Sequence, residues 1–289
     1  MNNYSRNLNQ RDRELLHFLW TWKVATTAAL TQRFFSDRSP HTAYKRLWEL
    51  ESSKYILAVS DFQTNHHVWT LTKLGFHIVR RDLPALREDG FRSENISHDL
   101  ITSAIHLGGY LLGTPTDVAL FSEQELRRLH LEFYPDWVPR SELHRPDGYW
   151  RVPVGNPMAT VALEVELSRK KTVQYEIVAD FYASYPAIIR VLWLVARPSM
   201  GMLIHDKIGK ALSNSPMIHN FVSLPKFLKS GWTAVIEHGP EQGKPITTLL
   251  GRKSPASPLL LGEKLLLDTR KSAYKSRVLR PLNPGCFRY

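Results

Sequence analysis

Residues 160–196 have the sequence TVALEVELSRKKTVQYEIVADFYASYPAIIRVLWLVA, and this stretch decides the expected fold of the second half of the chain. It begins with a run rich in β-branched and apolar residues, continues through an amphipathic segment, and ends with the near-continuous apolar run AIIRVLWLVA. These patterns are typical of a strand, a helix and a strand buried on both faces. Because such a unit connects parallel strands, we expect an α/β sheet here. The helix is expected to bury the side formed by Val173, Ile177, Val178, Phe181 and Tyr185.

A further strand is expected just before this stretch. The segment RPDGYWRV, residues 145–152, has strand-forming residues, and GNPM, residues 155–158, is typical of a hairpin loop. In that hairpin Asp147 lies on the first strand, and Glu164 and Glu166 lie on its antiparallel partner. Residues two apart on a strand point to the same side, so both glutamates face one way, and strand pairing can bring Asp147 alongside them.

Three converging carboxylates would repel one another strongly unless they shared a cation. Oxygen ligands suit Mg²⁺ or Mn²⁺, so we predict that Asp147, Glu164 and Glu166 hold one of these ions. A metal held in this way can activate a water molecule and stabilise the charge that develops on a phosphodiester. The alternative is a set of surface carboxylates on a strand whose opposite face is apolar.

The first third of the chain predicts three helices, a hairpin and a fourth helix. Helical spacing of apolar residues extends over 11–22, 28–35 and 41–52; the β-rich runs YILAVS and HHVWTLT follow, and TKLGFHIVRR resumes a helix. This order resembles the winged helix-turn-helix, whose last helix of the pair enters the major groove of DNA. We expect DNA contacts from the third helix through His41, Thr42, Tyr44, Lys45 and Arg46.

The chain of 289 residues is long enough for two domains. Residues 82–95, DLPALREDGFRSEN, contain Pro and Gly without sustained periodicity and predict the junction. We expect a DNA-binding domain at residues 1–92, an α/β domain at 93–238, and a basic, partly ordered C-terminal tail at 239–289. In the second domain SHDLITSAIHLGGYLL and SMGMLIHDKIGKAL predict helices, and WTAVIE predicts a strand that closes the sheet.

The net charge of +11 is unevenly distributed, with +5 over residues 1–92, −1 over residues 93–251 and +7 over residues 252–289. Basic ends around a neutral middle favour a protein whose ends hold a phosphate backbone, and a solvated basic surface is the alternative. The single Cys286 excludes an internal disulfide. We therefore expect a reducing cytoplasm as the compartment, and no membrane segment, because no apolar run is long enough for one.

Pro146-Asp147, followed by Glu164-Val165-Glu166 on the next strand, resembles the core of the PD-(D/E)xK nucleases, which have a restriction-endonuclease-like mixed sheet. The resemblance implies that Asp147 and Glu164 bind the catalytic metal. Glu166 stands where the family has a lysine that helps to orient the attacking water. A lysine in a migrated position, Lys170 or Lys171, would supply the missing ammonium group.

The combination of a winged helix with such a domain is similar to the replication-relaxation family and, within it, to the MobC-class relaxases of mobilisable plasmids and conjugative elements. The resemblance covers residues 11–224. It implies a Mg²⁺- or Mn²⁺-dependent endonuclease that nicks double-stranded DNA at an origin of transfer, with accessory mobilisation or coupling proteins as partners. Tyr182 is an auxiliary candidate on the helix after the acids. The rival interpretation is a non-catalytic DNA-binding regulator of replication or transcription with a degenerate nuclease fold, which the missing in-line lysine favours.

Overall fold

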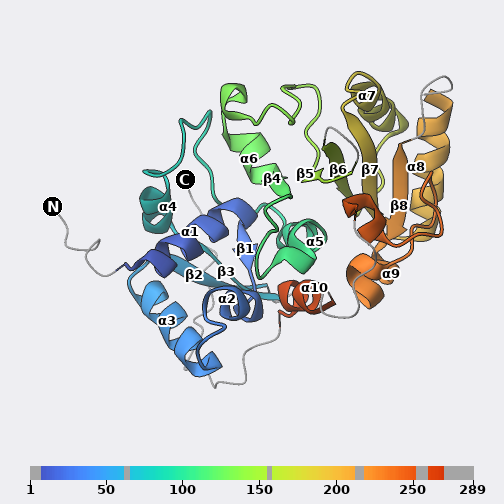
Figure 1. Cartoon of the computed structure of the whole chain (residues 1–289). Coiled ribbons are helices and arrows are strands. Elements are labelled where there is room, and N and C mark those ends of the chain that lie inside the picture. Colours follow the sequence, from blue (N-terminus) through green and yellow to red (C-terminus); the bar gives the residue numbers. More distant parts are fainter. Residues whose placement is uncertain (1–7, 62–65, 155–157, 212–217, 252–259, 270–289) are drawn as a thin grey trace.

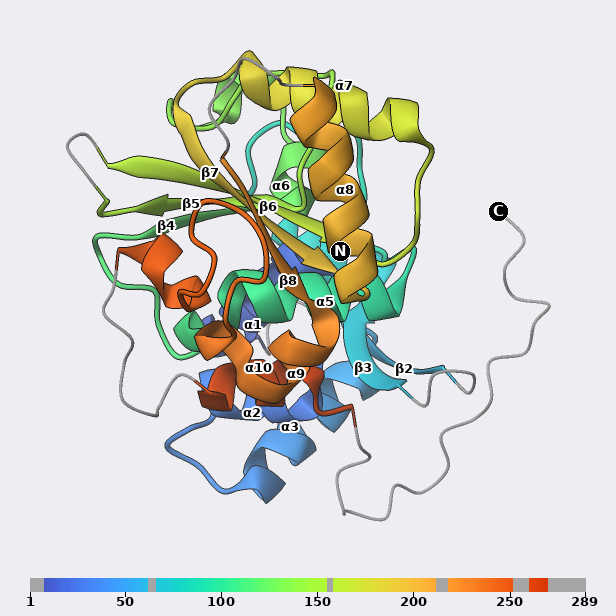
Figure 2. The ribbon, with the colours of Figure 1, turned by 90° about the vertical axis from the view of Figure 1, so that its right-hand side faces the viewer.

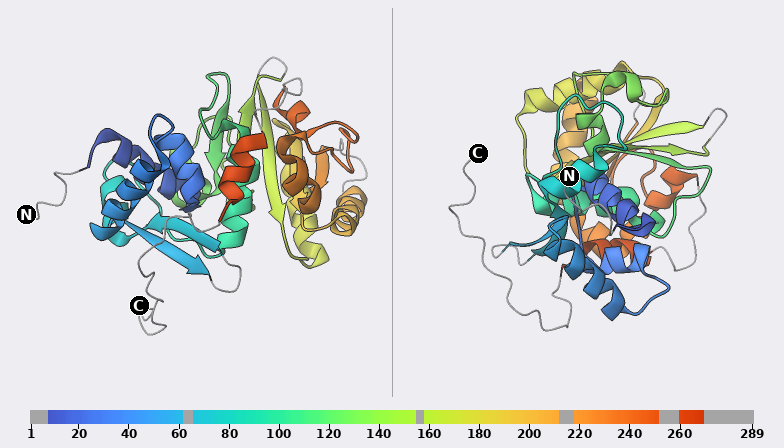
Figure 3. Two further views of the ribbon diagram at one scale, coloured as in Figure 1. Left: turned by 90° about the horizontal axis from the view of Figure 1, so that it is seen from below. Right: turned by 90° about the vertical axis from the view of Figure 1, so that its left-hand side faces the viewer.

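The computed structural model describes residues 8–61, 66–154, 158–211, 218–251 and 260–269. It is an α+β structure with helices and two sheets, one of them a mixed five-stranded sheet, as expected for the overall fold class (Figure 1). Figure 3 shows the helices of the N-terminal part on one side of α5 and the five-stranded sheet on the other.

The N-terminal unit, which we define as the described residues from 8 to 79, contains four helices and a small antiparallel sheet of order β1-β3-β2. The three predicted helices, the hairpin and the fourth helix are confirmed as elements. The strand β1 was not predicted, because two residues are too few to show a periodicity. The bounds are α1 (Gln10–Trp22), β1 (Val24–Ala25), α2 (Thr27–Phe34), α3 (Pro40–Ser52), β2 (Ile56–Asp61), β3 (His66–Leu71) and α4 (Lys73–Val79).

Polar caps fix where these helices begin. Asn9 and Asp12 form a capping box at the start of α1, and the Thr26 hydroxyl accepts a hydrogen bond from the Ala29 amide of α2. Ser39 caps α3 directly before Pro40, a residue that suits the first helical position. The caps set the short α2–α3 connection, so α3 follows α2 after a tight turn.

The sheet unit, which we define as the described residues from 96 to 230, is built on the order β4-β5-β6-β7-β8. Strands β4, β5 and β6 pair antiparallel, whereas β6, β7 and β8 pair parallel, which confirms the predicted hairpin and crossover. The bounds are α5 (Ile96–Leu107), β4 (Ala119–Ser122), α6 (Glu123–Arg128), β5 (Gly148–Val152), β6 (Ala159–Glu166), α7 (Thr172–Ala183), β7 (Ile188–Val195), α8 (Pro198–Ala211), β8 (His219–Ser223) and α9 (Leu224–Ser230).

Helices cover both faces of this sheet. Figures 1 and 2 show α5 on one face and α7 and α8 on the other. Every residue of β6 is buried, as is nearly all of β7, which agrees with their apolar sequences. Strands β6 and β7 therefore form a buried scaffold that positions the polar side chains at their ends.

The buried side of α7 differs from the prediction. Val173 and Ile177 are 54% and 50% exposed, whereas Tyr175, Ala179 and Tyr182 are buried with the predicted Val178 and Phe181. Both stripes have helical spacing, so periodicity alone could not choose between them. The aromatic stripe is favoured because its hydroxyl groups find hydrogen-bond partners at the end of β6, as described below.

The strand predicted at 232–237 was also wrong. Residues 231–233 form a short 3-10 helix, η4 (Gly231–Thr233), and the sheet is closed instead by β8. The apolar run is buried for another reason, since the Trp232 indole enters the core and donates to Ile105 O at 2.9 Å. Strand β8 was not predicted, because the polar residues His219 and Asn220 occupy buried positions where an apolar pattern would mark a strand.

One hydrophobic cluster extends through both units and includes residues from α1 to α10 (Leu260–Leu267). Trp22 at the end of α1 stacks edge-on against His106 of α5, with ring centroids 5.1 Å apart. Helix α10 packs against α2 and α5. Part of the predicted tail, residues 239–251 and α10, thus packs on the folded body, while 252–259 and 270–289 lie outside the described residues. None of the described helices is long and apolar enough to cross a membrane.

Candidate active site at the end of strand β6

Asp147 lies directly before β5 and not on the strand as predicted, whereas Glu164 lies on the antiparallel neighbour β6. Gly148 pairs with Leu163, and the Asp147 amide donates to Leu163 O at 2.9 Å. The Asp147 carboxyl also reaches the amide of Val165, the residue after Glu164. Its other partner, His98, comes from α5, whereas the Tyr182 partner of Glu164 comes from α7. Both acids thus lie at the point where β5 begins and β6 approaches its end.

Asp147 is held from two directions. Its Oδ2 accepts a hydrogen bond from the Val165 amide at 2.6 Å, and its Oδ1 lies 3.5 Å from His98 Nε2. Burial raises the pKa of Asp147 to about 7, and the nearby Glu164 carboxylate adds to this rise against the opposing effect of His98. Burial therefore disfavours the charged form of Asp147, which a bound cation would favour.

Glu164 is buried and bound by two donors on the α7 side of the sheet. His144 Nε2 lies 2.6 Å from Glu164 Oε1, and the Tyr182 hydroxyl donates to the same oxygen at 2.5 Å. Burial and the Glu164 carboxylate raise the pKa of Tyr182 well above its ordinary value. Such a phenol is a poor nucleophile, so Tyr182 is placed to orient Glu164.

Of the two candidate lysines, only Lys170 reaches the acids. Its Nζ lies 2.9 Å from Glu166 Oε2, and its amide donates to the Tyr175 hydroxyl at 3.0 Å. Burial acts to lower the pKa of Lys170, but Glu166 outweighs that effect and raises it. Lys171 is exposed at the N-cap of α7. The ammonium group of the site is therefore that of Lys170.

Three further residues of the site were not predicted from the sequence. His98, in the first turn of α5, lies 3.2 Å from Val165 O through Nε2. Burial acts to lower the pKa of His98, but Asp99 and Asp147 outweigh it and raise that pKa to about 9. Lys23, at the end of α1, pairs with Asp99 at 2.6 Å. The third is His144, three residues before Asp147, and only this one had a local signal in the sequence.

The predicted DNA-contact residues of α3 separate into two groups. His41, Thr42 and Lys45 are exposed and Tyr44 is half-buried. Arg46 instead binds the buried Asp12 with two hydrogen bonds, of 3.0 and 2.5 Å. It also binds Glu49 at 2.8 Å. Arg46 therefore ties α3 to α1.

Trp48, which was not among the predicted residues, is 57% exposed. With His41 and Lys45 it continues one line of positions, i, i+4 and i+7, along the helix. We call His41, Lys45 and Trp48 the outer stripe of α3.

The donors at the end of β6 match a divalent cation in their chemistry, since Asp147 and Glu164 are crowded oxygen ligands of the kind that Mg²⁺ and Mn²⁺ prefer. Among the residues that the structure describes, no three His, Cys, Asp or Glu side chains converge on one metal position. Internal groups hold each acid, His98 on Asp147, His144 on Glu164 and Lys170 on Glu166. A metal bound by Asp147 and Glu164 would replace the contacts of the two histidines.

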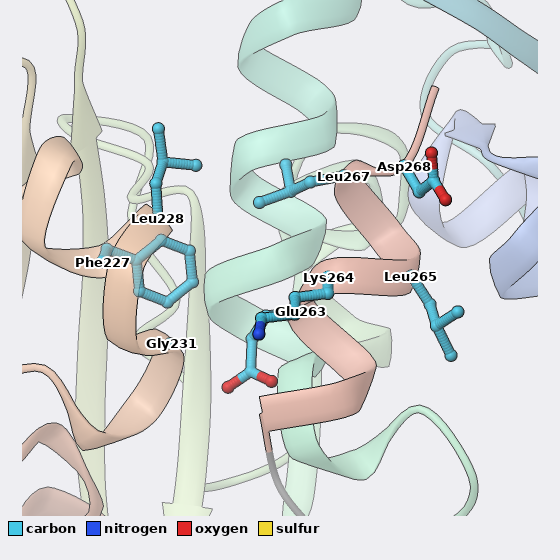
Figure 4. A pocket seen from close by; sticks show the side chains of 8 residues that line it. All are labelled: Phe227, Leu228, Gly231, Glu263, Lys264, Leu265, Leu267 and Asp268. Atoms are coloured by element: carbon cyan, nitrogen blue, oxygen red, sulfur yellow. The ribbon is translucent and has the colours of Figure 1, made fainter. Parts of the chain in front are cut away.

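A pocket of about 430 Å³ lies between α9 and α10, away from these acids (Figure 4). Glu263 lines it, is 3% exposed and accepts a hydrogen bond from the Trp232 amide at 2.9 Å. A side chain on Gly231 would collide with this carboxylate, because a Cβ atom there would lie 2.7 Å from Glu263 Oε1. Glu263 therefore ties α10 to η4, and no predicted site residue lines the pocket.

No protein-family model matches this chain, and neither the curated proteins nor the solved structures contain a match.

Proposed function

We propose that the protein is a DNA-binding, metal-dependent endonuclease that nicks one strand of duplex DNA, similar in class to the MobC-type relaxases of plasmid and conjugative-element mobilisation. One observation carries the proposal. Asp147, just before β5, accepts a hydrogen bond from the amide of Val165, the residue after Glu164 on β6, and the Lys170 ammonium group lies 2.9 Å from Glu166 on the same strand as Glu164. This set of groups supports a PD-(D/E)xK-like site with a migrated lysine.

The N-terminal unit supports the DNA-binding part of the proposal. Its order of helices and strands, with a three-stranded sheet after α3, suits a winged helix-turn-helix. The outer stripe of α3 offers a cation and an aromatic ring to a groove. Double-stranded DNA, with an origin of transfer as its specific site, is the proposed partner, together with accessory mobilisation or coupling proteins.

Each residue of the site has a distinct proposed role. Asp147 and Glu164 would hold Mg²⁺ or Mn²⁺, which when bound lowers the pKa of water and stabilises charge on the phosphate. Lys170 supplies a fixed positive charge for the phosphodiester in the transition state. Tyr182 orients Glu164 through its 2.5 Å hydrogen bond, and His98 orients Asp147 from the start of α5.

The test is nicking of supercoiled plasmid that carries the transfer origin of the element encoding the protein, with Mg²⁺ or Mn²⁺, scored as open circles. We expect Asp147→Ala to abolish metal-dependent nicking and Lys170→Ala to slow it by about a hundredfold, the scale of a lost charge-stabilising group. Lys171→Ala is the matched control, because the two lysines are exposed neighbours and it is Lys170 that pairs with Glu166. A parent protein that nicks no plasmid with either metal would refute the proposal.

A second candidate is a non-catalytic DNA-binding regulator. The observation that favours it is the pairing of all three acids with internal partners, His98, His144 and Lys170. Buried pairs of this kind also occur as purely structural networks. On that reading Asp147→Ala and Lys170→Ala change thermal stability, while the parent binds the origin and leaves the plasmid supercoiled.

A further inference from the structure

Lys23 is a buried lysine that crosses from the N-terminal unit to the sheet unit. It directly follows α1, and its Nζ lies 2.6 Å from Asp99 Oδ1 of α5 and 2.6 Å from Glu123 Oε2 of α6. The side chains of Lys23 and Asp99 are 11% and 4% exposed. An ammonium group so deeply buried needs a carboxylate partner, because without one its charge would have no compensation.

The backbone at Lys23 is adapted to this contact. Its φ angle is +63°, in a region that non-glycine residues seldom adopt and that costs about 1–3 kcal/mol. The preceding residue, Trp22, packs on His106 two turns further along α5. The end of α1 thus contacts α5 twice, through Trp22 on His106 and through Lys23 on Asp99. Lys23, the residue with the strained backbone, is also the one that carries the charge.

From Asp99 the contacts continue to the candidate active site. The Oδ1 atom that binds Lys23 lies 3.8 Å from His98 Nδ1, and His98 Nε2 lies 3.5 Å from Asp147 Oδ1. Asp147 in turn accepts the Val165 amide at 2.6 Å. A continuous line of ionisable groups therefore extends from the end of α1 to Asp147.

We propose that Lys23 is a positioning residue for this site, and that through Asp99 and His98 it fixes the Asp147 carboxylate. The site is then complete only while the end of α1 is docked on α5. The catalytic consequence rests on the nuclease function proposed above, whereas the positional consequence rests on the contacts alone. The N-terminal unit has, on this view, a second role beside its contact with DNA.

The test uses the full chain with Lys23→Met, Asp99→Asn and Glu123→Gln combined. Removing all three charges together leaves no buried charge unpaired, so the fold is expected to survive. The first readout is the amide proton shift of Val165, because this amide reports its hydrogen bond to Asp147 without any need for activity. The second is the split between kcat and KM for nicking, and the third is the affinity for duplex DNA.

We expect the Val165 amide resonance to move upfield as its short hydrogen bond lengthens. We also expect kcat to fall about ten- to a hundredfold, the usual effect of groups that orient a metal ligand, with KM and DNA affinity unchanged. The matched control is Arg190→Gln with Glu241→Gln, which removes an ion pair of 2.8 Å where β7 begins and should change none of the three readouts. Restoring only the lysine–aspartate pair, in the Glu123→Gln single variant, should recover most of the shift and of kcat.

An unchanged Val165 amide in the triple variant would overturn the proposal, whatever happens to the rate. Should the parent show no metal-dependent nicking, the proposed function fails, and the amide shift alone decides the role of Lys23. If the triple variant does not fold, the Glu123→Gln variant carries the test, since Glu123 is the most exposed of the three. A smaller upfield shift of Val165 is then expected, and no shift would refute the role.

Discussion

Asp147 is the residue at which catalysis and stability are expected to oppose each other. Its pKa in the folded protein is about 7 against 3.8 in the absence of perturbation, mainly because of burial. A carboxyl whose pKa is raised by folding contributes its stability below pH 3.8 and loses it as the pH rises towards 7. The ionised site is therefore a cost to the fold at neutral and higher pH.

We predict that Asp147→Asn stabilises the protein above pH 7 and removes nicking. The amide keeps an acceptor for the Val165 N–H but carries no charge. Three pKa units correspond to at most about 4 kcal/mol, so the free energy of unfolding should rise by a few kcal/mol at pH 8 and by little at pH 4. Denaturant titrations at the two pH values measure this difference. Equal stability of parent and variant at pH 8 would contradict it.

Arg46 is expected to act on stability and only weakly on DNA. It forms two hydrogen bonds with Asp12, whose side chain is fully buried. Arg46→Ala leaves that carboxylate without its partner, and we predict a loss of about 3 kcal/mol in the free energy of unfolding. Lys45→Ala, its exposed neighbour on α3, is the control and should change stability by about 0.5 kcal/mol or less. Similar melting temperatures for the two variants would argue against this assignment.

The sequence predicts site residues well where the partners share one hairpin and poorly where they do not. Asp147 and Glu164 could be paired because a strand register follows from alternation and loop length. Lys170 and Lys171 could both be named as candidates for the ammonium group. The sequence could not choose between them, because the conformation of the loop after β6 decides which lysine reaches an acid. Lys23 could not be foreseen, because its contact with Asp99 joins residues 76 positions apart through the packing of α1 on α5.

At the scale of elements, helix α3 is expected to contact DNA through its outer stripe, His41, Lys45 and Trp48. Lys45 is exposed, and Trp48 presents its indole at a solvent-exposed position of the helix, where a polar side chain is usual. We predict that Lys45→Ala lowers the salt dependence of binding by about one unit, as the loss of one phosphate contact should. Trp48→Ala should weaken binding at an unchanged salt slope, because an apolar contact releases no counterion.

Fluorescence anisotropy at several salt concentrations separates the two effects. Lys210→Ala on α8 is the matched control, since it also removes one exposed lysine, from a helix on the far side of the five-stranded sheet from the N-terminal unit (Figure 1). If Lys45→Ala and Lys210→Ala reduce the salt slope equally, binding depends on net charge and α3 has no special place in it.

The elements themselves were largely predictable, and the exceptions have one cause. Helix α3 and strands β6 and β7 follow from periodicity, because their buried positions hold apolar residues. Strand β8 buries His219 and Asn220, and α7 buries hydroxyl groups that bind the acids and the following loop. In both, buried polar atoms bond to partners that only the tertiary structure supplies, as the Trp193 indole does when it donates to His219 Nδ1 at 3.0 Å.

At the scale of the whole molecule, the predicted junction at 82–95 separates two units in sequence, but one hydrophobic cluster joins them in space. Helix α10 also contacts the N-terminal unit, since the Thr26 hydroxyl donates a hydrogen bond to Leu265 O at 2.5 Å. Composition marked residues 239–289 as tail, yet α10 buries Leu266 and Glu263. A boundary defined by charge and by Pro and Gly content does not reveal that a short helix within the basic region is needed by the core.

The position of α10 decides how the basic tail should be tested. Truncation after Gly251 would remove α10 and expose the surfaces that it covers on α2 and α5, so any loss of DNA binding could result from unfolding.

Truncation after Thr269 keeps α10 and removes six basic residues and no acidic one. We predict that this variant keeps the melting temperature of the parent and binds DNA more weakly, with a salt slope reduced by up to about five units. The loss should be the same for an origin duplex and for a random duplex, because phosphate contacts carry no sequence information. A loss confined to the origin duplex would show instead that residues 270–289 recognise sequence, and the neutral middle with basic ends would then need another explanation.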